Sequence, residues 1–387
     1  MDFPAWPEYG EDEIAAVDAV LRSGKVNYWS GDQGSSFERE FSAFIGAAHG
    51  IALANGTLAL EVAMYGLGIG EGDEVIVPAR TFIATASSVV MRGAVPVVAD
   101  IDLYSGNLTV ETIDAARNEK TRAIIVVHLG GWPCDMPAIM AYAEAHGLLV
   151  IEDCAQAHGA EVHGRKVGSF GHAAAFSFCQ DKIISTGGEG GMLVTDDEAV
   201  SRKVWAFKDH GRDFEEVFTR RHGPGHRWLC NTFGTNWRLT EMQSAIGRLQ
   251  LKKLPEWLAI RRDYAAMMIE GLSNVPGLVI HVPHEGFLHA WYRFYAFIDT
   301  AALSPGWNQD RIIDAVASEG VPCFHGSCSE IYREKAFQHL MRESYPLRNA
   351  QLAGRSSLAL PLYPTLERAH IEKMIDVVSM VMTRATG

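Results

Sequence analysis

Residues 174–195 read AAFSFCQDKIISTGGEGGMLVT, and this stretch indicates the fold class. Two short apolar segments, Ala174–Phe178 and Met192–Thr195, flank a glycine-rich turn that contains one lysine, Lys182. Apolar runs of this length, bounded by turn residues, are typical of buried strands. Five earlier runs have the same character: Gly50–Ala54, Glu74–Val77, Val95–Ala99, Ala123–Val127 and Leu148–Ile151.

Helical patterns alternate with these runs. Asp135 precedes the segment MPAIMAYAEAH, with Pro137 in the first turn and Gly147 just past the end, which predicts a capped helix. Thr240 and Gln243 form a capping-box pattern in front of apolar residues at helical spacing. Continuous apolar strands that alternate with helices predict an α/β fold with a mostly parallel, seven-stranded sheet covered on both faces.

The pattern changes near Pro255. This proline is expected to end the helix that begins at Thr240, and fewer buried runs follow it. We therefore predict a large domain over residues 1–254 and a smaller α+β domain over residues 255–387. The N-terminal helix, with Ile14 and Leu21 among its apolar residues, could pack on either domain.

Composition and charge exclude several classes of protein. The chain has 387 residues, of which 48% are hydrophobic, enough for a sizeable core. Its 34 Lys and Arg against 47 Asp and Glu give a net charge of −13, which argues against nucleic-acid partners and anionic membranes. No apolar run approaches the roughly 18 residues of a spanning helix, and the acidic first twenty residues do not resemble an export signal.

The six cysteines favour a cytoplasmic location. They are scattered, and no two have the CxxC spacing of a metal or redox site. Without an export signal, reduced thiols are the better interpretation, and we expect no metal site.

Two short motifs suggest where a ligand binds. Asp153 ends the run GLLVIED, and open α/β sheets bind ligands at the carboxyl ends of their strands. Asn55, Gly56 and Thr57 stand between a predicted strand and a helix, where free N–H groups can hold a phosphate. Each motif also has a purely structural explanation, because Asp and Asn are common helix caps.

Lys182 adds a nucleophile to this set. A lysine amine can form a Schiff base with a carbonyl compound, although most lysines simply lie on the surface. A lysine, an acid that can pair with a pyridinium nitrogen and a phosphate cradle are together what pyridoxal phosphate requires. The sequence contains neither GxxxxGK[ST] nor a GxGxxG after the first strand, so a P-loop or a Rossmann dehydrogenase is unsupported.

The chain resembles the DegT/StrS-type sugar aminotransferases, which are fold-type I pyridoxal-phosphate enzymes. The resemblance extends from about Pro7 to Met382. It includes GDEVIVPARTFIATA, GAVPVVADID, HLGGWPCDM, IEDCAQAHGA, the segment around Lys182, GTNWRLTEMQSAIGRLQL and LALPLYP, in this order. Several motifs in the right order are more specific than any one of them.

The resemblance implies a role for each cofactor-binding residue. Lys182 would form the Schiff base with pyridoxal 5′-phosphate, and Asp153 would keep the pyridine nitrogen protonated. Gln156 would lie at the phenolic oxygen of the ring, and Phe82 would stack on the ring face. Three residues would hold the phosphate: Gly56, Thr57 and Ser177.

It also implies a homodimer with shared active sites. Asn236, in GTNWR, would reach the cofactor phosphate of the partner subunit. His325, in CFHGSCSEIY, matches a position that often faces the substrate. The stretch 211–233 is longer than in many relatives, and it carries three arginines that could meet a nucleotide diphosphate or could simply be solvated: Arg220, Arg221 and Arg227.

The expected reaction is the transfer of an amino group from L-glutamate to a nucleotide-linked 4-keto-6-deoxyhexose. The segment KIISTGGEGG, which begins at Lys182, resembles the family members that act at C4 of the sugar. The product would be a 4-amino-4,6-dideoxy sugar for surface polysaccharides, including lipopolysaccharide. A C3 ketosugar, a ketocyclitol and a non-catalytic regulatory role remain as alternatives, whereas the family's dehydratases carry His in place of the lysine.

Overall fold

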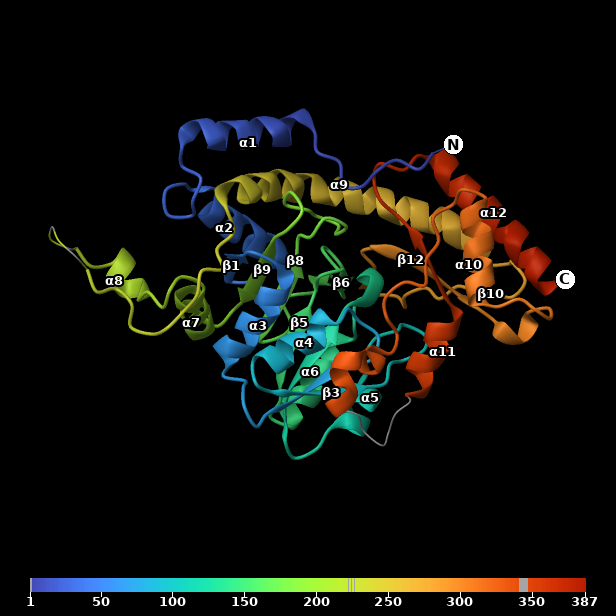
Figure 1. Ribbon diagram of the computed structural model, residues 1–387, viewed down its shortest axis with the longest axis horizontal. Coiled ribbons are helices and arrows are strands. Elements are labelled where there is room, and N and C mark those ends of the chain that lie inside the picture. Colours follow the sequence, from blue (N-terminus) through green and yellow to red (C-terminus); the bar gives the residue numbers. More distant parts are fainter. Residues whose placement is uncertain (1, 222, 224, 226, 341–346) are drawn as a thin grey trace.

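The computed structural model describes residues 2–221, 223, 225, 227–340 and 347–387. A seven-stranded sheet forms the centre of the fold (Figure 1). Its strands, in spatial order, are β1 (His49–Leu53), β9 (Gly191–Thr195), β8 (Ala173–Ser177), β5 (Leu149–Asp153), β4 (Thr121–Val127), β2 (Glu74–Pro78) and β3 (Val95–Ala99). Every predicted strand of this sheet is confirmed, with bounds that differ by at most two residues.

The sheet is mostly parallel, as predicted. Only β9 runs antiparallel to its neighbours β1 and β8, while the successive pairs from β8 to β3 are parallel. The carboxyl ends of β5 and β8 therefore lie at the same edge as the start of β9, where Ser177 is paired with Gly191. Ligands of open α/β sheets bind at this edge.

Helices cover both faces of the sheet because its strands are apolar on both sides. Ile151 and Ala175 face the cluster formed with α3, α4 and α7, whereas Val150 and Phe176 face α2, α5, α6 and the first half of α9. These helices, apart from α9, are α2 (Gln33–Ile45), α3 (Gly56–Leu67), α4 (Ala84–Met91), α5 (Val110–Ala116), α6 (Met136–Ala145) and α7 (Glu198–Lys208). The predicted cap of α6 is confirmed, since the side chain of Asp135 accepts the N–H of Ala138 at 3.2 Å.

Helix α9 (Glu241–Leu272) begins after Thr240, as predicted, but it does not end at Pro255. The expected break there is wrong. An interior proline costs roughly 3 kcal/mol, yet buried side chains hold the helix on both sides of it. Leu254 packs under the large sheet and Met268 in the C-terminal core, and burial of such a side chain contributes about 1.5–3 kcal/mol.

The C-terminal part has its own core. Its antiparallel sheet contains β10 (Leu278–Val279), β12 (Arg293–Ile298) and β13 (Ser357–Pro361), and its helices are α10 (Gln309–Ser318), α11 (Arg348–Ser356) and α12 (Arg368–Thr386). The buried apolar residues of this core lie between Ala265 and Ala385. This distribution supports a smaller C-terminal domain, whose division at residue 255 stays a prediction.

Three smaller features complete the chain. Helix α1 (Glu11–Ser23) lies along α9, where Lys253 pairs with Asp12 and Glu13 at 2.8 and 2.7 Å (Figure 1). A short sheet joins β11 (Phe287–Leu288), β6 (Glu161–Val162) and β7 (Arg165–Lys166). The segment that carries α8 (Phe214–Phe218) projects to one side of the molecule (Figure 1).

Two further observations concern location. Within the described ranges, no helix combines the length and the apolar content that a membrane crossing requires. All six cysteines are free thiols.

Candidate active site

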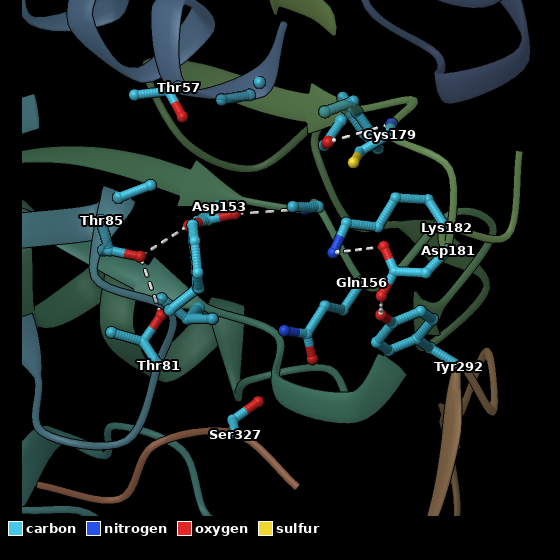
Figure 2. A pocket seen from close by; sticks show the side chains of 18 of the residues that line it. Thr57, Thr81, Thr85, Asp153, Gln156, Cys179, Asp181, Lys182, Tyr292 and Ser327 are labelled. Atoms are coloured by element: carbon cyan, nitrogen blue, oxygen red, sulfur yellow. Dashed lines mark hydrogen bonds and ion pairs between the residues drawn. The ribbon is translucent and has the colours of Figure 1, made fainter. Parts of the chain in front are cut away.

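A cavity of about 960 Å³ opens at the carboxyl edge of the large sheet. Figure 2 shows that residues from the start of α3, from the end of β5, from the loop after β8 and from the C-terminal part point into it. Its lining includes six of the predicted cofactor residues together with Lys182: Gly56, Thr57, Phe82, Asp153, Gln156 and Ser177. The structure therefore brings together residues that lie more than a hundred positions apart in the sequence.

The start of α3 and the end of β8 form one side of this cavity. Asn55 caps α3, since its side chain accepts the N–H of Leu58 at 3.0 Å. A Cβ atom on Gly56 would lie 2.7 Å from the Cβ of Ser177, so only glycine allows this close approach. Helix N–H groups and the hydroxyls of Thr57 and Ser177 thus border the same space, which suits a phosphate group.

Asp153 lies at the end of β5 and is almost completely buried. Its carboxylate accepts the hydroxyl of Thr85 at 2.9 Å and the N–H of Ala155 at 3.2 Å. No helix follows β5 directly, so the alternative interpretation of Asp153 as a helix cap is wrong. Burial raises the pKa of Asp153, and the two hydrogen bonds and the charge of Lys182 oppose that rise.

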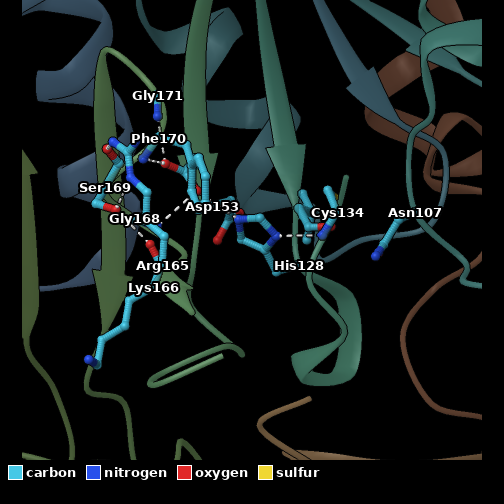
Figure 3. Close-up of polar contacts among 12 residues, drawn as sticks. Asn107, His128, Cys134, Asp153, Arg165, Lys166, Gly168, Ser169, Phe170 and Gly171 are labelled. Atoms are coloured by element: carbon cyan, nitrogen blue, oxygen red, sulfur yellow. Dashed lines mark hydrogen bonds and ion pairs between the residues drawn. The ribbon is translucent and has the colours of Figure 1, made fainter. Parts of the chain in front are cut away.

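A network of buried hydrogen bonds surrounds Glu152, the neighbour of Asp153 at the end of β5. Both oxygens of Glu152 accept hydrogen bonds, from Gly168, Phe170 and Gly171 at 2.7–2.8 Å and from the His128 ring at 3.1 Å. The other ring nitrogen of His128 accepts the N–H of Cys134 at 3.0 Å (Figure 3). Since Nδ1 accepts, the proton of His128 sits on Nε2.

The same residues form a cluster with metal-binding side chains. One ligand atom each from His128, Glu152 and Cys154 lies within 4.8 Å of the others, and all three residues are buried. Every nitrogen of His128 and every carboxylate oxygen of Glu152 already has a hydrogen-bond partner. Hydrogen bonding therefore explains this cluster without a metal ion.

Lys182 reaches into the cavity from the loop between β8 and β9. Its side chain is only 16% exposed, so the alternative of a surface lysine is wrong. The amine lies 3.6 Å from an oxygen of Asp181 and 5.0 Å from the ring centre of Tyr292. Burial disfavours its charge, but Tyr292, Asp181 and Asp153 together raise the pKa of Lys182. The amine must therefore lose a proton before it can attack a carbonyl group.

Asp181 connects Lys182 to the C-terminal part of the chain. The hydroxyl of Tyr292 donates to one oxygen of Asp181, and Arg293 lies 3.6 Å from the same oxygen. Although burial opposes its ionisation, these neighbours and Lys182 lower the pKa of Asp181. Sequence reasoning missed all three residues. Asp181 could have been noted as the neighbour of Lys182, but Tyr292 and Arg293, just before and at the start of β12, carry no local signal.

Gln156 and Phe82 present the groups that a flat ring would need. The amide oxygen of Gln156 accepts the N–H of Gly130 at 2.7 Å, which leaves the amide N–H₂ as the donor toward the cavity. Phe82 borders the cavity and is 67% exposed, unusual for a phenylalanine beside a buried core. Its ring is available to stack on a ligand.

Five predicted site residues do not reach this cavity in their own chain. The backbone of Asn236 forms an isolated bridge with the buried Asp209, at the end of α7. His325 pairs with Asp310 at 2.7 Å on the outer surface. The three arginines of the projecting segment are exposed, and one of them pairs with Glu216: Arg220, Arg221 and Arg227. Residues 222, 224 and 226 of that segment lie outside the described residues.

Comparisons with known proteins agree with this geometry. Residues 7–379 match the sequence model of the DegT/DnrJ/EryC1/StrS aminotransferase family. The chain belongs to this family. A solved aminotransferase from Psychrobacter cryohalolentis is 47% identical, with a TM-score of 0.98 and full coverage of both chains.

Two curated relatives have named activities. A UDP-N-acetyl-3-dehydro-alpha-D-glucosamine 3-aminotransferase from Acidithiobacillus ferrooxidans is 38% identical over 90% of this chain and 88% of its own. The GDP-perosamine synthase of Caulobacter vibrioides is 37% identical over 89% of both chains.

The protein is therefore a pyridoxal-phosphate-dependent sugar aminotransferase. The cavity fits this cofactor on three independent grounds. The close contact of Gly56 with Ser177 keeps the start of α3 open to a phosphate, the exposed ring of Phe82 is free to stack, and Asp153 supplies a buried acid. The predicted fold and cofactor are both confirmed.

Proposed function

We propose that the enzyme transfers the amino group of L-glutamate to a nucleotide-linked 4-keto-6-deoxyhexose. The product would be a 4-amino-4,6-dideoxy sugar for surface polysaccharides, lipopolysaccharide or other glycoconjugates. The observation that carries this proposal is the buried lysine, Lys182, which faces a large cavity together with Asp153. A regulatory protein on this fold would not need such a lysine.

Each cavity residue has a role in this proposal. Pyridoxal phosphate, when bound, supplies an electron sink for the carbon that loses a proton. Lys182 would hold the cofactor covalently, and its Nζ would be placed to move a proton at the carbon that receives the amino group. Asp153 holds the proton of the ring nitrogen, and Gln156 donates to the phenolic oxygen.

The remaining cavity residues bind and orient the cofactor. Phe82 stacks on the ring face, and the start of α3 anchors the phosphate through backbone N–H groups and hydroxyls. The phosphate-binding residues are Gly56, Thr57 and Ser177.

The position of amination rests on the turn that follows Lys182. Its sequence, KIISTGGEGG, resembles the family members that act at C4. This turn borders the cavity through Lys182 and Glu189, so its shape can influence how a sugar ring lies over the cofactor. Amination at C3 is the second candidate, because the relative from Acidithiobacillus ferrooxidans is named as a 3-aminotransferase.

The proposal also includes a homodimer with shared active sites and a cytoplasmic location. Asn236 lies beside the end of α7, at the base of the projecting segment, and the three arginines are exposed farther along that segment, so none of the four lines the cavity of its own chain. Such a segment can deliver them to the cavity of a second copy, where the arginines would meet the diphosphate of the substrate. His325 lies outside the cavity, between the lining residues Phe324 and Gly326, and would meet only a part of the nucleotide sugar that extends beyond the cavity.

The experiment is an assay with paired substrates. The enzyme, loaded with pyridoxal phosphate, is incubated with L-glutamate and either a 4-keto or a 3-keto nucleotide hexose, and the position of the new amine is determined by NMR. We expect nitrogen at C4. Nitrogen only at C3 would favour the second candidate, and no turnover of any ketosugar would contradict both.

A further inference from the structure

A second, much smaller cavity lies behind one wall of the main cavity. Its volume is about 20 Å³, and Tyr295 lines both spaces. A cavity needs roughly 10–15 Å³ to hold one water-sized particle, so this one has room for a single small species. Its wall is largely aromatic and contains one cation, Arg80. The rings in this wall include those of Tyr104, His281, His289, Tyr295 and Phe297.

Arg80 is 1% exposed, yet its charge has no counterion among the residues that the structure describes. Within the described ranges, none of its three guanidinium nitrogens makes a hydrogen bond of ordinary geometry, and the side chain that interacts with the group, Tyr295, offers a hydroxyl and not a carboxylate. The group lies between two rings, 4.9 Å from the centre of Tyr295 and 5.6 Å from that of Phe297. Ring faces attract a cation, but they cannot accept five N–H bonds. A buried charge without a partner destabilises the folded protein, so the guanidinium of Arg80 requires a hydrogen-bond acceptor.

Arg261 shows how this protein normally treats a buried arginine. It is equally buried, and one of its terminal nitrogens donates to the carbonyl oxygens of Trp291, at 3.1 Å, and Leu362. The contrast indicates that burial alone does not explain Arg80. The missing partner of Arg80 is an acceptor that the described part of the chain does not provide.

A second donor borders the same cavity. The Nδ1 atom of His289 accepts the N–H of Trp291 at 2.7 Å, and burial lowers the pKa of His289 to about 3. The ring is therefore neutral, and its proton sits on Nε2. His281 donates from Nδ1 to the carbonyl of Tyr104 at 2.7 Å. No carboxylate is found among the described residues that line the cavity.

We propose that this cavity binds one small inorganic anion of the halide class, such as chloride, against the guanidinium of Arg80. The small volume favours a compact ion over carboxylates and phosphates, and the lining offers a cation and an N–H donor without an acidic group. Tyr295 separates this site from the main cavity, and its hydroxyl accepts the N–H of Ser327 at 3.0 Å. The bound anion would thus stabilise a wall of the active site. The anion site is independent of which sugar the enzyme uses.

Crystals of the holoenzyme grown in sodium bromide provide the direct test. Data collected at the bromine absorption edge should show an anomalous peak within contact distance of the Arg80 guanidinium. The peak should be absent in Arg80→Met. A water molecule in place of the peak in the wild-type crystals, or an empty cavity, would overturn the proposal, and this result does not require any variant to fold.

Thermal unfolding gives an independent measurement in solution. Sodium chloride replaces sodium gluconate at constant ionic strength, because gluconate is too large for the cavity. The melting temperature of the wild type should rise with chloride and then saturate, whereas Arg80→Met should show no such dependence. Arg92→Met is the matched control, since Arg92 also lies over two rings, at 5.2 and 5.6 Å, but is partly exposed. A chloride response that is equal in all three proteins would contradict the site.

Discussion

The floor and the rim of the main cavity are built in different ways. We use "floor" for the edge of the large sheet, with Gly56, Asp153 and Ser177, and "rim" for the residues that approach from elsewhere, with Asp181 and Tyr292 as examples. The floor residues stand at strand or helix ends, and buried hydrogen bonds hold Asp153 and its neighbour Glu152 at the end of β5. The rim residues come from a loop and from the C-terminal part, and they depend mainly on one another.

This difference separates two tasks. A rigid floor suits a cofactor that every family member shares, because binding geometry is best fixed by regular secondary structure. A rim assembled from loops and a second core can vary with the substrate. We therefore expect changes in the floor to affect every step of the reaction, and changes in the rim to affect particular steps.

The largest effect is expected at the meeting point of floor and rim. Lys182→Ala should lower the rate of transamination by at least about 10³-fold, because it removes both the covalent anchor and the group that moves the proton. Circular dichroism and thermal unfolding should remain close to those of the wild type. Lys203→Ala, a change of an exposed lysine on α7 outside the cavity, is the control and should remain active. Substantial activity in Lys182→Ala would place the chemistry elsewhere.

Asp153→Asn tests the floor alone. The amide keeps the size of the side chain and can still accept from Thr85, but it cannot hold the proton of a pyridinium nitrogen as a carboxylate does. We expect a loss of about 10²–10³-fold in turnover, comparable to the removal of one electrostatic contact in other active sites. Thr85→Val should lose far less. Equal activity of Asp153→Asn and the wild type would mean that Asp153 has only a structural role.

The projecting segment tests whether the rim includes a second copy of the chain. Lys182→Ala and Asn236→Ala proteins should each be inactive alone, and together they should regain about a quarter of wild-type activity. Half of randomly mixed dimers are heterodimers, and each of these has one intact site out of two. Exchange of subunits is verified by mass spectrometry of the mixture. No recovery after confirmed exchange would contradict the shared site.

The smallest effect is expected from a rim residue that acts through Lys182. Asp181 raises the pKa of Lys182, so Asp181→Asn should lower that pKa and free the amine at lower pH. The rate at which the apo-enzyme combines with pyridoxal phosphate is measured against pH. Its rise should move to lower pH in Asp181→Asn and stay in place in Asp310→Asn, whose partner His325 lies outside the cavity. An unchanged pH profile in Asp181→Asn would mean that Asp181 does not influence the amine of Lys182.

The difference between floor and rim also determines which site residues could be predicted from the sequence. Floor residues such as Asp153 and Gly56 follow apolar runs that are visible in the sequence, and the parallel sheet brings the ends of these runs together. Tyr292 and Arg293 could not be predicted, because β12 faces the cavity only after the C-terminal core has packed against the large sheet. Pro255 failed to predict the end of a helix for a related reason, since distant packing on both sides outweighs its local effect on α9.

Reduction of the holoenzyme with borohydride, followed by peptide mapping, tests the assignment of the site most directly. This treatment fixes the cofactor to the lysine that carries it. We predict that the label is found on Lys182. The chain contains another buried lysine, Lys208, which pairs with Glu38 at 2.7 Å outside the cavity. A label on Lys208, or on any lysine other than Lys182, would contradict the proposed active site.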